Sequence, residues 1–505
     1  VYAFNPQLGI AAEWARLLTE RLQDEAYQRT ACASFRQQLF LHQAVLSAVI
    51  SARVKPGRIR PLPLSHGYPF TQHGQLDPSL QVSSFNALAA VIFDYAWDKI
   101  PTWLDRLDAD EPLRQWLFDT YLAYLKLDDN LYRMEGSCNS YLVTTPAGSV
   151  LIDPAGATAA PQYFRKLLAG CPLQAILLTH AHQDHWGHLD VWLNGADIPV
   201  IAQREFITYN EYCERLAPFY ARRAAIWARR PLPAPDEVEP LNAPVPTVTF
   251  ADEYTYELGG VHFRMVHTPG ETPDHTTIWI PELRAVFVGD NYYEYFINNA
   301  TLRGTNTRPV LGYIAALDLA LSYKPAWFLM GHGSPVVTPD LVQRTVTDFR
   351  DALQYVHDET IRGINAGQDV HTLMREIRLP DKFNVRPYFG QVHWTVRGIY
   401  HENIGWFEEN PADMYDVPAS SIYPDLVDLA GADAILDRAK ALIGSREYVL
   451  ALRLTDVVLA ADPQNRAAHE LRLAALEGLK AGTANYIERI WLDYGIRLAK
   501  ESLDQ

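Results

Sequence analysis

A dense group of metal-ligand side chains lies in the segment THAHQDHWGH, residues 179–188. Its ligand-type members form an H-x-H-x-D-H pattern of His180, His182, Asp184 and His185. Imidazole and carboxylate groups are the ligands that zinc uses in proteins. Because alternate residues of an extended loop point the same way, His180 and His182 can hold one metal ion. Asp184 and His185 then face a second ion, so the segment predicts a two-metal site.

Three further turns supply the remaining ligand-type residues, and each follows an apolar run typical of a strand. They are HTPGETPDHT (267–276), GDNYYEY (289–295) and GHGSP (331–335). Binding residues often lie in loops at the ends of strands. We expect Glu271 to complete the first metal site and His332 the second. Asp290 can bridge both.

The elements that must position these turns alternate between strand and helix over residues 126–340. Strands are predicted at 140–145, 149–153, 174–179, 198–202, 261–266, 276–280, 285–289 and 326–330. Helical patterns lie at 160–169, 187–194, 204–229 and 311–322. This alternation predicts an α/β domain with helices covering its sheet. Asp153, which ends one predicted strand, is expected to orient a ligand histidine from behind.

Helical patterns flank this central zone on both sides. The first zone holds such patterns at Ala11–Leu22 and Asn86–Leu104. After residue 340 the chain has no clear strand pattern, and helices are expected at 341–365, 432–443, 446–461, 467–480 and 487–502. We therefore predict three domains: a helical N-terminal region (1–125), a catalytic domain (126–340) and an all-α region (341–505).

Composition narrows the class of protein. The 505 residues include 44 Lys plus Arg and 60 Asp plus Glu, a net charge of −16. Nucleic-acid binding needs a basic face, so this class is disfavoured. No apolar run reaches the roughly 18 residues of a membrane span, and we expect a soluble protein. The sequence starts VYAFNPQ without Met, and it leaves the compartment open between the cytoplasm, the periplasm and secretion.

The ligand set resembles that of the metallo-β-lactamase superfamily. The residues that carry the resemblance are His180, His182, Asp184, His185, Asp290 and His332. It implies an αβ/βα sandwich with two Zn²⁺ ions per chain at one edge, and catalytic roles for Asp184 and Asp290. Many members of the superfamily have a histidine after the T-P-G turn, whereas this chain has Glu271 there. A glutamate at this position is typical of the zinc-dependent alkylsulfatases within the superfamily. His275 stays open as the alternative ligand.

Two further stretches resemble the same alkylsulfatase subfamily, the type III sulfatases. NNATLRGT (298–305) is similar to the segment that holds the sulfate group, which gives Arg303 the anion-binding role and Asn298 an assisting one. A planar guanidinium can make two parallel hydrogen bonds to a sulfate edge. YFGQVHWTVRGIYHENIGWFEENP (388–411) and the helices after it look like the subfamily's dimerisation domain, which implies a homodimer. The subfamily's C-terminal sterol-carrier-like domain is expected to be absent.

These features predict a dinuclear zinc hydrolase that cleaves alkyl or aryl sulfate esters with metal-activated hydroxide. Its partners would be a small anionic ester and a second copy of the chain. Trp394 and Thr395 stand where the subfamily has a His–Asn pair, which leaves the substrate open. The alternatives are another ester class on the same site (a phosphoester, lactone or β-lactam) and a metal-binding interaction protein without catalysis. The organic group, S–O against C–O cleavage and the role of residues 1–125 stay open.

Overall fold

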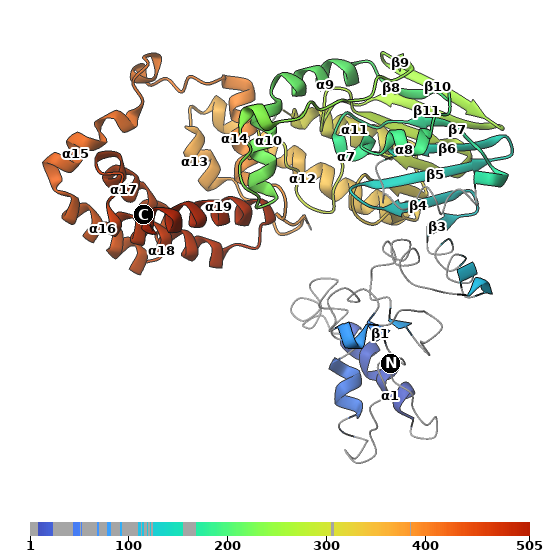
Figure 1. The fold of residues 1–505 in the computed structure, drawn as a ribbon, viewed down its shortest axis with the longest axis horizontal. Coiled ribbons are helices and arrows are strands. Elements are labelled where there is room, and N and C mark those ends of the chain that lie inside the picture. The colour runs from blue at the N-terminus through green and yellow to red at the C-terminus, as the bar shows by residue number, and fades with distance from the viewer. Residues whose placement is uncertain are drawn as a thin grey trace. The chain divides into compact units, whose positions relative to one another are not determined.

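The computed structural model describes residues 125–154, 168–304, 308–383 and 385–504, with shorter stretches between residues 9 and 122. Contacts within the chain divide it into two compact units, Val1–Leu125 and Lys126–Gln505. Figure 1 draws the elements of both units along the chain. Among the described residues, no helix combines the length and the hydropathy that a membrane crossing needs.

The first unit contains the predicted N-terminal helix, which is α1 (Ile10–Gln23). Ile10 is buried there with Leu46 and Val49. Strand β1 (Tyr68–Pro69) pairs with β2 (Val91–Ile92), and η5 (Pro78–Leu80) is a 3₁₀ turn. The predicted helix over Asn86–Leu104 is wrong at β2, where two β-branched residues join a strand pair. The rest of that range lies outside the described residues.

Two sheets form the centre of the second unit. The seven-stranded sheet runs, in spatial order, β3 (Lys126–Asp128), β4 (Leu131–Glu135), β5 (Asn139–Thr145), β6 (Gly148–Ile152), β7 (Leu173–Leu177), β8 (Val200–Gln203) and β9 (Val248–Phe250). The six-stranded sheet runs β10 (Glu253–Leu258), β11 (Val261–His267), β12 (Thr276–Ile280), β13 (Ala285–Phe287), β14 (Trp327–Leu329) and β15 (Val336–Val337). Every strand predicted from the sequence is present. Pairing is parallel from β6 to β9 and between β13 and β14.

The two sheets share one apolar core. Val150 and Leu177 of the first sheet are buried in the same cluster as Phe263 and Phe287 of the second. All five residues of β6 are buried, as expected for a strand covered on both faces. Figure 1 shows the two sheets side by side with helices outside them. The result is the αβ/βα sandwich that the sequence predicts.

Helices cover the outside of the sandwich. On the six-stranded sheet, α11 (Val310–Ser322), α12 (Pro339–Asn365) and α14 (Val392–Ile404) pack through Leu317, Phe349 and Ile399 against Phe328. After β7 and β8 come α7 (Gln183–Trp186), α8 (Leu189–Leu193), α9 (Glu205–Arg215) and α10 (Ala217–Trp227). The single helix predicted over 204–229 is therefore two helices, because Pro218 starts a new one at α10. Of the helix predicted over 160–169, residues 160–167 lie outside the described residues.

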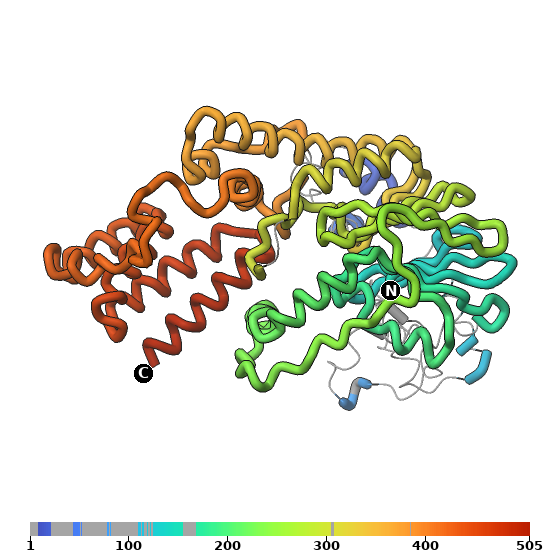
Figure 2. Tube along the Cα trace, turned by 90° about the horizontal axis from the view of Figure 1, so that it is seen from above, coloured from blue at the N-terminus to red at the C-terminus, as the bar shows by residue number. Residues whose placement is uncertain are grey.

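The remaining helices lie beyond α12. They are α13 (Val370–Glu376), α15 (Tyr423–Ala430), α16 (Ala432–Gly444), α17 (Tyr448–Ala461), α18 (Arg466–Gly482) and α19 (Tyr486–Leu503). Short 3₁₀ turns are η8 (Pro235–Glu237), η9 (Pro281–Leu283), η10 (Pro411–Met414) and η11 (Ala419–Ile422). Figures 1 and 2 both place α15 to α18 at the end of this unit that lies away from the sheets. Arg229 joins α10 to α19 through Asp493 at 2.9 Å.

Candidate metal centre

The seven predicted ligand residues meet at one edge of the sandwich, where strands of both sheets end. They are His180, His182, Asp184, His185, Glu271, Asp290 and His332. The first four follow β7 and extend into α7, and the last three follow β11, β13 and β14 in turn. Segments that lie far apart in the sequence therefore contribute to one cluster.

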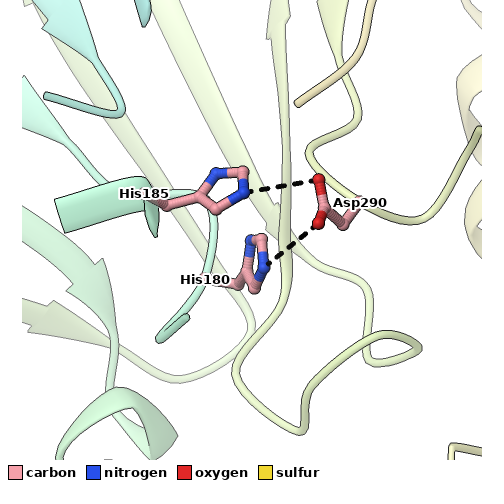
Figure 3. Close-up of side chains that lie close together, drawn as sticks. All are labelled: His180, His185 and Asp290. Carbon is pink, nitrogen blue, oxygen red and sulfur yellow. Dashed lines mark ion pairs between the residues drawn. The ribbon is translucent and has the colours of Figure 1, made fainter. Parts of the chain in front are cut away.

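Asp290 lies at the middle of this cluster. Its Oδ1 is 3.4 Å from His185 Nε2, and its Oδ2 is 3.9 Å from His180 Nε2 (Figure 3). The same Oδ2 is 3.4 Å from His332 Nε2. A carboxylate with imidazoles around both oxygens can bridge two ions, the role predicted for Asp290.

The other ligand-type residues lie to two sides of Asp290. On what we name the Asp184 side, formed by Asp184, His185 and His332, the Asp184 Oδ2 is 3.2 Å from His332 Nε2. On the Glu271 side, formed by His182 and Glu271, the Glu271 Oε1 is 3.7 Å from His182 Nδ1. The ligand atoms of Asp184, His185 and His332 lie close enough to share one ion, as do those of His182, Glu271 and Asp290. His180, which the sequence pattern places with His182, has its ligand atom close to those of His185 and Asp290, and its Nε2 also lies 3.0 Å from His182 Nδ1. The assignment of each ligand to one of two ions stays a prediction.

Asp153 orients two of the histidines through hydrogen bonds, one of them direct and the other through Thr179. Its Oδ2 accepts hydrogen bonds from His185 Nδ1 at 2.8 Å and from the Thr179 hydroxyl at 2.7 Å. The Thr179 oxygen is in turn 3.1 Å from His180 Nδ1. A carboxylate can only accept, so the proton of His185 lies on Nδ1 and its Nε2 is left to face the cluster. Asp153 holds a left-handed backbone with φ 52°, which costs a non-glycine residue about 1 kcal/mol.

The donor atoms of the cluster fit a divalent cation. His185 Nε2 and Asp290 Oδ1 are both buried and have no hydrogen-bond partner among the described residues. A buried polar atom without a partner is costly in a folded protein. Imidazole nitrogen and carboxylate oxygen are zinc ligands, so an ion between these atoms would satisfy them.

Burial and neighbouring charges shift the pKa values of the ionisable side chains in the cluster. Burial lowers the pKa of His182 to about 3, so its imidazole is neutral at pH 7. Burial also lowers the pKa of His332, but Asp290 and Asp184 outweigh it and raise that pKa to about 10. Burial would raise the pKa of Asp290, yet His332 and His185 hold it well below its usual range. Asp290 is therefore ionised at neutral pH, as a carboxylate ligand of a cation must be.

The structure places Glu271, and not His275, in the cluster. His275 Nε2 accepts a hydrogen bond from the Asp290 backbone N–H at 3.2 Å. Its Nδ1 lies 3.0 Å from Asn291 Nδ2 and 3.3 Å from the Thr268 hydroxyl. Both ring nitrogens are thus engaged within the protein, whereas Glu271 faces His182.

Three residues around the cluster were missed by sequence reasoning. Arg308 and Tyr313 both bond to the Glu271 carboxylate, and the Tyr293 hydroxyl donates to Asp290 Oδ2 at 2.7 Å. Burial raises the pKa of Glu271, and Arg308 opposes that shift. The sequence offers one weak signal, the closeness of Tyr293 to Asp290. Nothing in the spacing singles out Arg308 or Tyr313.

A pocket of about 520 Å³ opens beside His182, between α9, α10 and the segment 238–241. Its walls include Tyr209, Tyr220, Trp227 and Arg303. The Arg303 guanidinium lies over the Trp227 ring, 4.8 Å from its centre. Asn298, the other predicted sulfate contact, is bonded through its backbone carbonyl to Arg308 at 3.2 Å. The predicted anion-binding arginine therefore shares a pocket with a ligand-type histidine.

Comparison with known families covers both parts of the second unit. Residues 133–332 match the metallo-β-lactamase superfamily, and residues 370–498 match the alkyl sulfatase dimerisation family. The chain joins a metallo-β-lactamase domain to an alkyl sulfatase dimerisation domain. The first match spans the whole cluster from His180 to His332.

Relatives that match about 70% of this chain include alkylsulfatases. A linear primary-alkylsulfatase of Pseudomonas sp. is 24% identical over 381 residues, which are 69% of this chain and 72% of the relative. The alkyl/aryl-sulfatase BDS1 of Saccharomyces cerevisiae is 24% identical over 72% of this chain, and an (R)-specific secondary-alkylsulfatase of Pseudomonas sp. is 25% identical over 71%. The chain spans 62% and 60% of the length of these last two relatives.

A solved structure shares the fold. The stereoselective inverting sec-alkylsulfatase Pisa1 from Pseudomonas sp. superimposes with a TM-score of 0.66 at 22% identity, covering 84% of this chain and 72% of Pisa1. The metallo-β-lactamase fold and the helical C-terminal region are therefore both established.

Proposed function

We infer that this chain is a hydrolase of sulfate esters that works with a pair of divalent cations, Zn²⁺, in the cluster around Asp290. The observation that carries the metal part is that seven ligand-type side chains gather in one cluster, in which His185 Nε2 and Asp290 Oδ1 are buried without a hydrogen-bond partner among the described residues. The substrate class rests on the alkylsulfatase relatives. Alkyl and aryl sulfate esters are both included.

The chemistry that such cations would supply when bound is hydroxide at neutral pH, because a divalent cation lowers the pKa of water bound to it towards 7. The residues assigned to the first ion are His180, His182 and Glu271, those assigned to the second are Asp184, His185 and His332, and Asp290 would contact both. Asp153 and Thr179 keep the imidazole protons on Nδ1 of His185 and His180, so that both Nε2 atoms face the cluster. The Asp184 side chain is 41% exposed, and although burial would raise the pKa of its carboxyl, His185 and His332 hold that pKa well below its usual range, so Asp184 is ionised and able to act as a ligand at neutral pH.

The sulfate group is assigned to Arg303, which lines the pocket beside His182, and to Asn298. Arg303 remains exposed, so its guanidinium can donate to an anion while its face rests on Trp227. Asn298 has a buried side-chain oxygen without a hydrogen-bond partner among the described residues. The organic group of the ester would then lie along the aromatic walls of the pocket. The net charge of −16 gives no long-range attraction for an anion, so these local groups must bind it.

The test is sulfate release from a panel of alkyl and aryl sulfates by purified protein, before and after a chelator and again after Zn²⁺ is restored. We expect release that is lost on chelation and regained with Zn²⁺. If the protein hydrolyses a phosphoester, lactone or β-lactam but none of the sulfate esters, the proposed substrate class is wrong. Bound zinc without any hydrolysis would contradict the enzymatic proposal.

Arg303 gives a sharper test of the substrate class. Arg303→Ala removes charge-assisted hydrogen bonds worth about 1.5–3 kcal/mol, so we expect kcat/KM for a sulfate ester to fall roughly 10–100-fold with metal content unchanged. Arg230→Ala, an exposed arginine just after α10, is the matched control. Unchanged kinetics in Arg303→Ala would remove Arg303 from the sulfate site.

We also propose that the chain forms a homodimer through its helical region. Residues 370–498 match the alkyl sulfatase dimerisation family, and within them Trp406, Tyr415 and Leu429 are 72%, 70% and 85% exposed, so a partner subunit could cover them. Light scattering should give the mass of two chains. Leu429→Asp should shift the protein to monomer, whereas Val245→Asp, at a 75% exposed position of the catalytic domain, should not. A strict monomer in the wild type would refute this assignment.

A further inference from the structure

The carboxylate of Glu271 is held by two protein donors, one on each oxygen. Arg308 Nη1 donates to Oε1 at 2.5 Å, and the Tyr313 hydroxyl donates to Oε2 at 2.5 Å. The backbone N–H of Glu271 also donates to Asn291 Oδ1 at 2.9 Å. Glu271 and Arg308 are each 3% exposed and Tyr313 is fully buried, so the contacts are shielded from water. Hydrogen bonds in such surroundings define a side chain's position strongly.

Both donors are themselves fixed. Arg308 Nη1 makes a second hydrogen bond, to the backbone carbonyl of Asn298 at 3.2 Å. Tyr313 lies in the first turns of α11, and its ring belongs to the core cluster that joins this helix to the six-stranded sheet. Gly312 lets α11 approach the Glu271 turn closely, because a Cβ at this position would lie 2.3 Å from the Pro269 carbonyl oxygen. The donors therefore belong to the rigid frame of the domain.

The oxygen that accepts from Arg308 also faces the cluster. Glu271 Oε1 is 3.7 Å from His182 Nδ1. A carboxylate oxygen has two lone pairs, so one can accept from Arg308 while the other remains for a cation. Without the two donors, the three side-chain torsions of a glutamate would allow several positions for this oxygen.

We propose that Arg308 and Tyr313 are positioning residues that hold Glu271 in place for metal binding on the Glu271 side of the cluster. They act through Glu271 and take no part in the Asp184 side, whose histidine His185 is oriented by Asp153 instead. The inference rests on the proposed function only in requiring that the cluster binds divalent cations. Outer partners of metal ligands affect affinity by roughly 10–100-fold when removed.

The experiment is a Zn²⁺ titration of the metal-free protein in competition with a chromophoric chelator, which resolves two successive affinities without any substrate. We expect Arg308→Met to weaken one of the two affinities about 10–100-fold and to leave the other within about twofold. Tyr313→Phe, which keeps the ring and removes a single hydroxyl, should weaken the same affinity by up to about tenfold. Arg350→Met, which breaks the Asp318 ion pair between α12 and α11, and Tyr292→Phe, a buried tyrosine of the same core cluster, are the matched controls.

The outcomes separate this inference from the proposed function. Wild-type affinities in both variants, or an equal loss at both sites, would overturn the positioning role and leave the hydrolase proposal intact. If Arg308→Met does not fold, as judged by its thermal unfolding, Tyr313→Phe alone decides between these outcomes. If the wild-type protein binds two ions but cleaves no sulfate ester, the proposed substrate is wrong and the proposed positioning role is unaffected. Failure of the wild type to bind any Zn²⁺ would refute both.

Discussion

The two sides of the cluster are supported in different ways. On the Asp184 side, Asp184 and His185 lie in one turn of helix directly after β7, and Asp153 at the end of the neighbouring strand β6 orients His185. On the Glu271 side, the donors to Glu271 come from residues 37 and 42 positions further along the chain. On the Asp184 side the support for the ligand is a carboxylate at the end of a strand, and on the Glu271 side it comes from the packing of α11 against a turn. The comparison teaches that the residues of the H-x-H-x-D-H motif can be recognised in the sequence, whereas the donors that hold Glu271 depend on tertiary packing.

Asp290 belongs to both sides, and its loss should have the largest effect. Asp290→Asn replaces a carboxylate that faces His180, His185 and His332 with a neutral amide. A metal centre stabilises a transition state by several kcal/mol, so we expect turnover of a sulfate ester to fall at least about a thousandfold. Metal analysis should show both ions reduced. Retention of two tightly bound ions would contradict the bridging assignment and the division into two sides.

Asp153→Asn should act mainly on the Asp184 side, because Asp153 bonds directly to His185 and reaches His180 only through the Thr179 hydroxyl. An amide nitrogen at Oδ2 cannot accept from His185 Nδ1 or from the Thr179 hydroxyl, so the orientation of His185 is lost. We expect one Zn²⁺ affinity to fall roughly 10–100-fold, and it should be the affinity that Tyr313→Phe leaves unchanged. The double variant Asp153→Asn with Tyr313→Phe should then weaken both. If the two single variants weaken the same ion, the two sides are not independent.

The smallest predicted effect concerns Asp274, a buried acid in the turn that carries Glu271. Burial raises the pKa of Asp274 to about 7, above the value near 3.9 of an unfolded chain. The folded state therefore binds more protons between these values, and stability falls as the pH rises from about 4 to 7. Denaturant unfolding of the metal-free protein should show that Asp274→Asn gains about 1–2 kcal/mol over the wild type between pH 5 and pH 8. An equal difference at both pH values would place the titrating group elsewhere.

Much of the sandwich could be predicted because its strands are short apolar runs with clear ends. Among the strands that escaped prediction, three have other patterns: along β10 exposed and half-buried residues alternate at the edge of a sheet, and β3 and β4 carry charged residues. Strands β9 and β15 are mostly apolar but only three and two residues long. The break between α9 and α10 has a visible signal in Pro218, although the helical periodicity continues on both sides of it.

The residues of the candidate site could likewise be predicted only in part from the sequence. The histidines and Asp184 follow from their spacing, and Asp290 and His332 from turns after strands. Arg303 was found through a resemblance, and the structure places it on Trp227 at the pocket wall. Arg308 and Tyr313 could not be found, because their role depends on how closely Gly312 lets α11 approach residue 269. Such a contact is a property of the fold and leaves no local pattern.

The central claim is that side chains from His180 to His332 hold two divalent cations at the edge of the sandwich. The most direct test is anomalous diffraction from crystals of the zinc-loaded protein. The data are collected at wavelengths above and below the X-ray absorption edge of zinc. We predict two anomalous peaks about 3.5–4 Å apart, with Asp290 between them, Glu271 and His182 at one, and Asp184 and His332 at the other. A single peak, peaks outside this cluster, or no peak in protein exposed to excess Zn²⁺ would contradict the account.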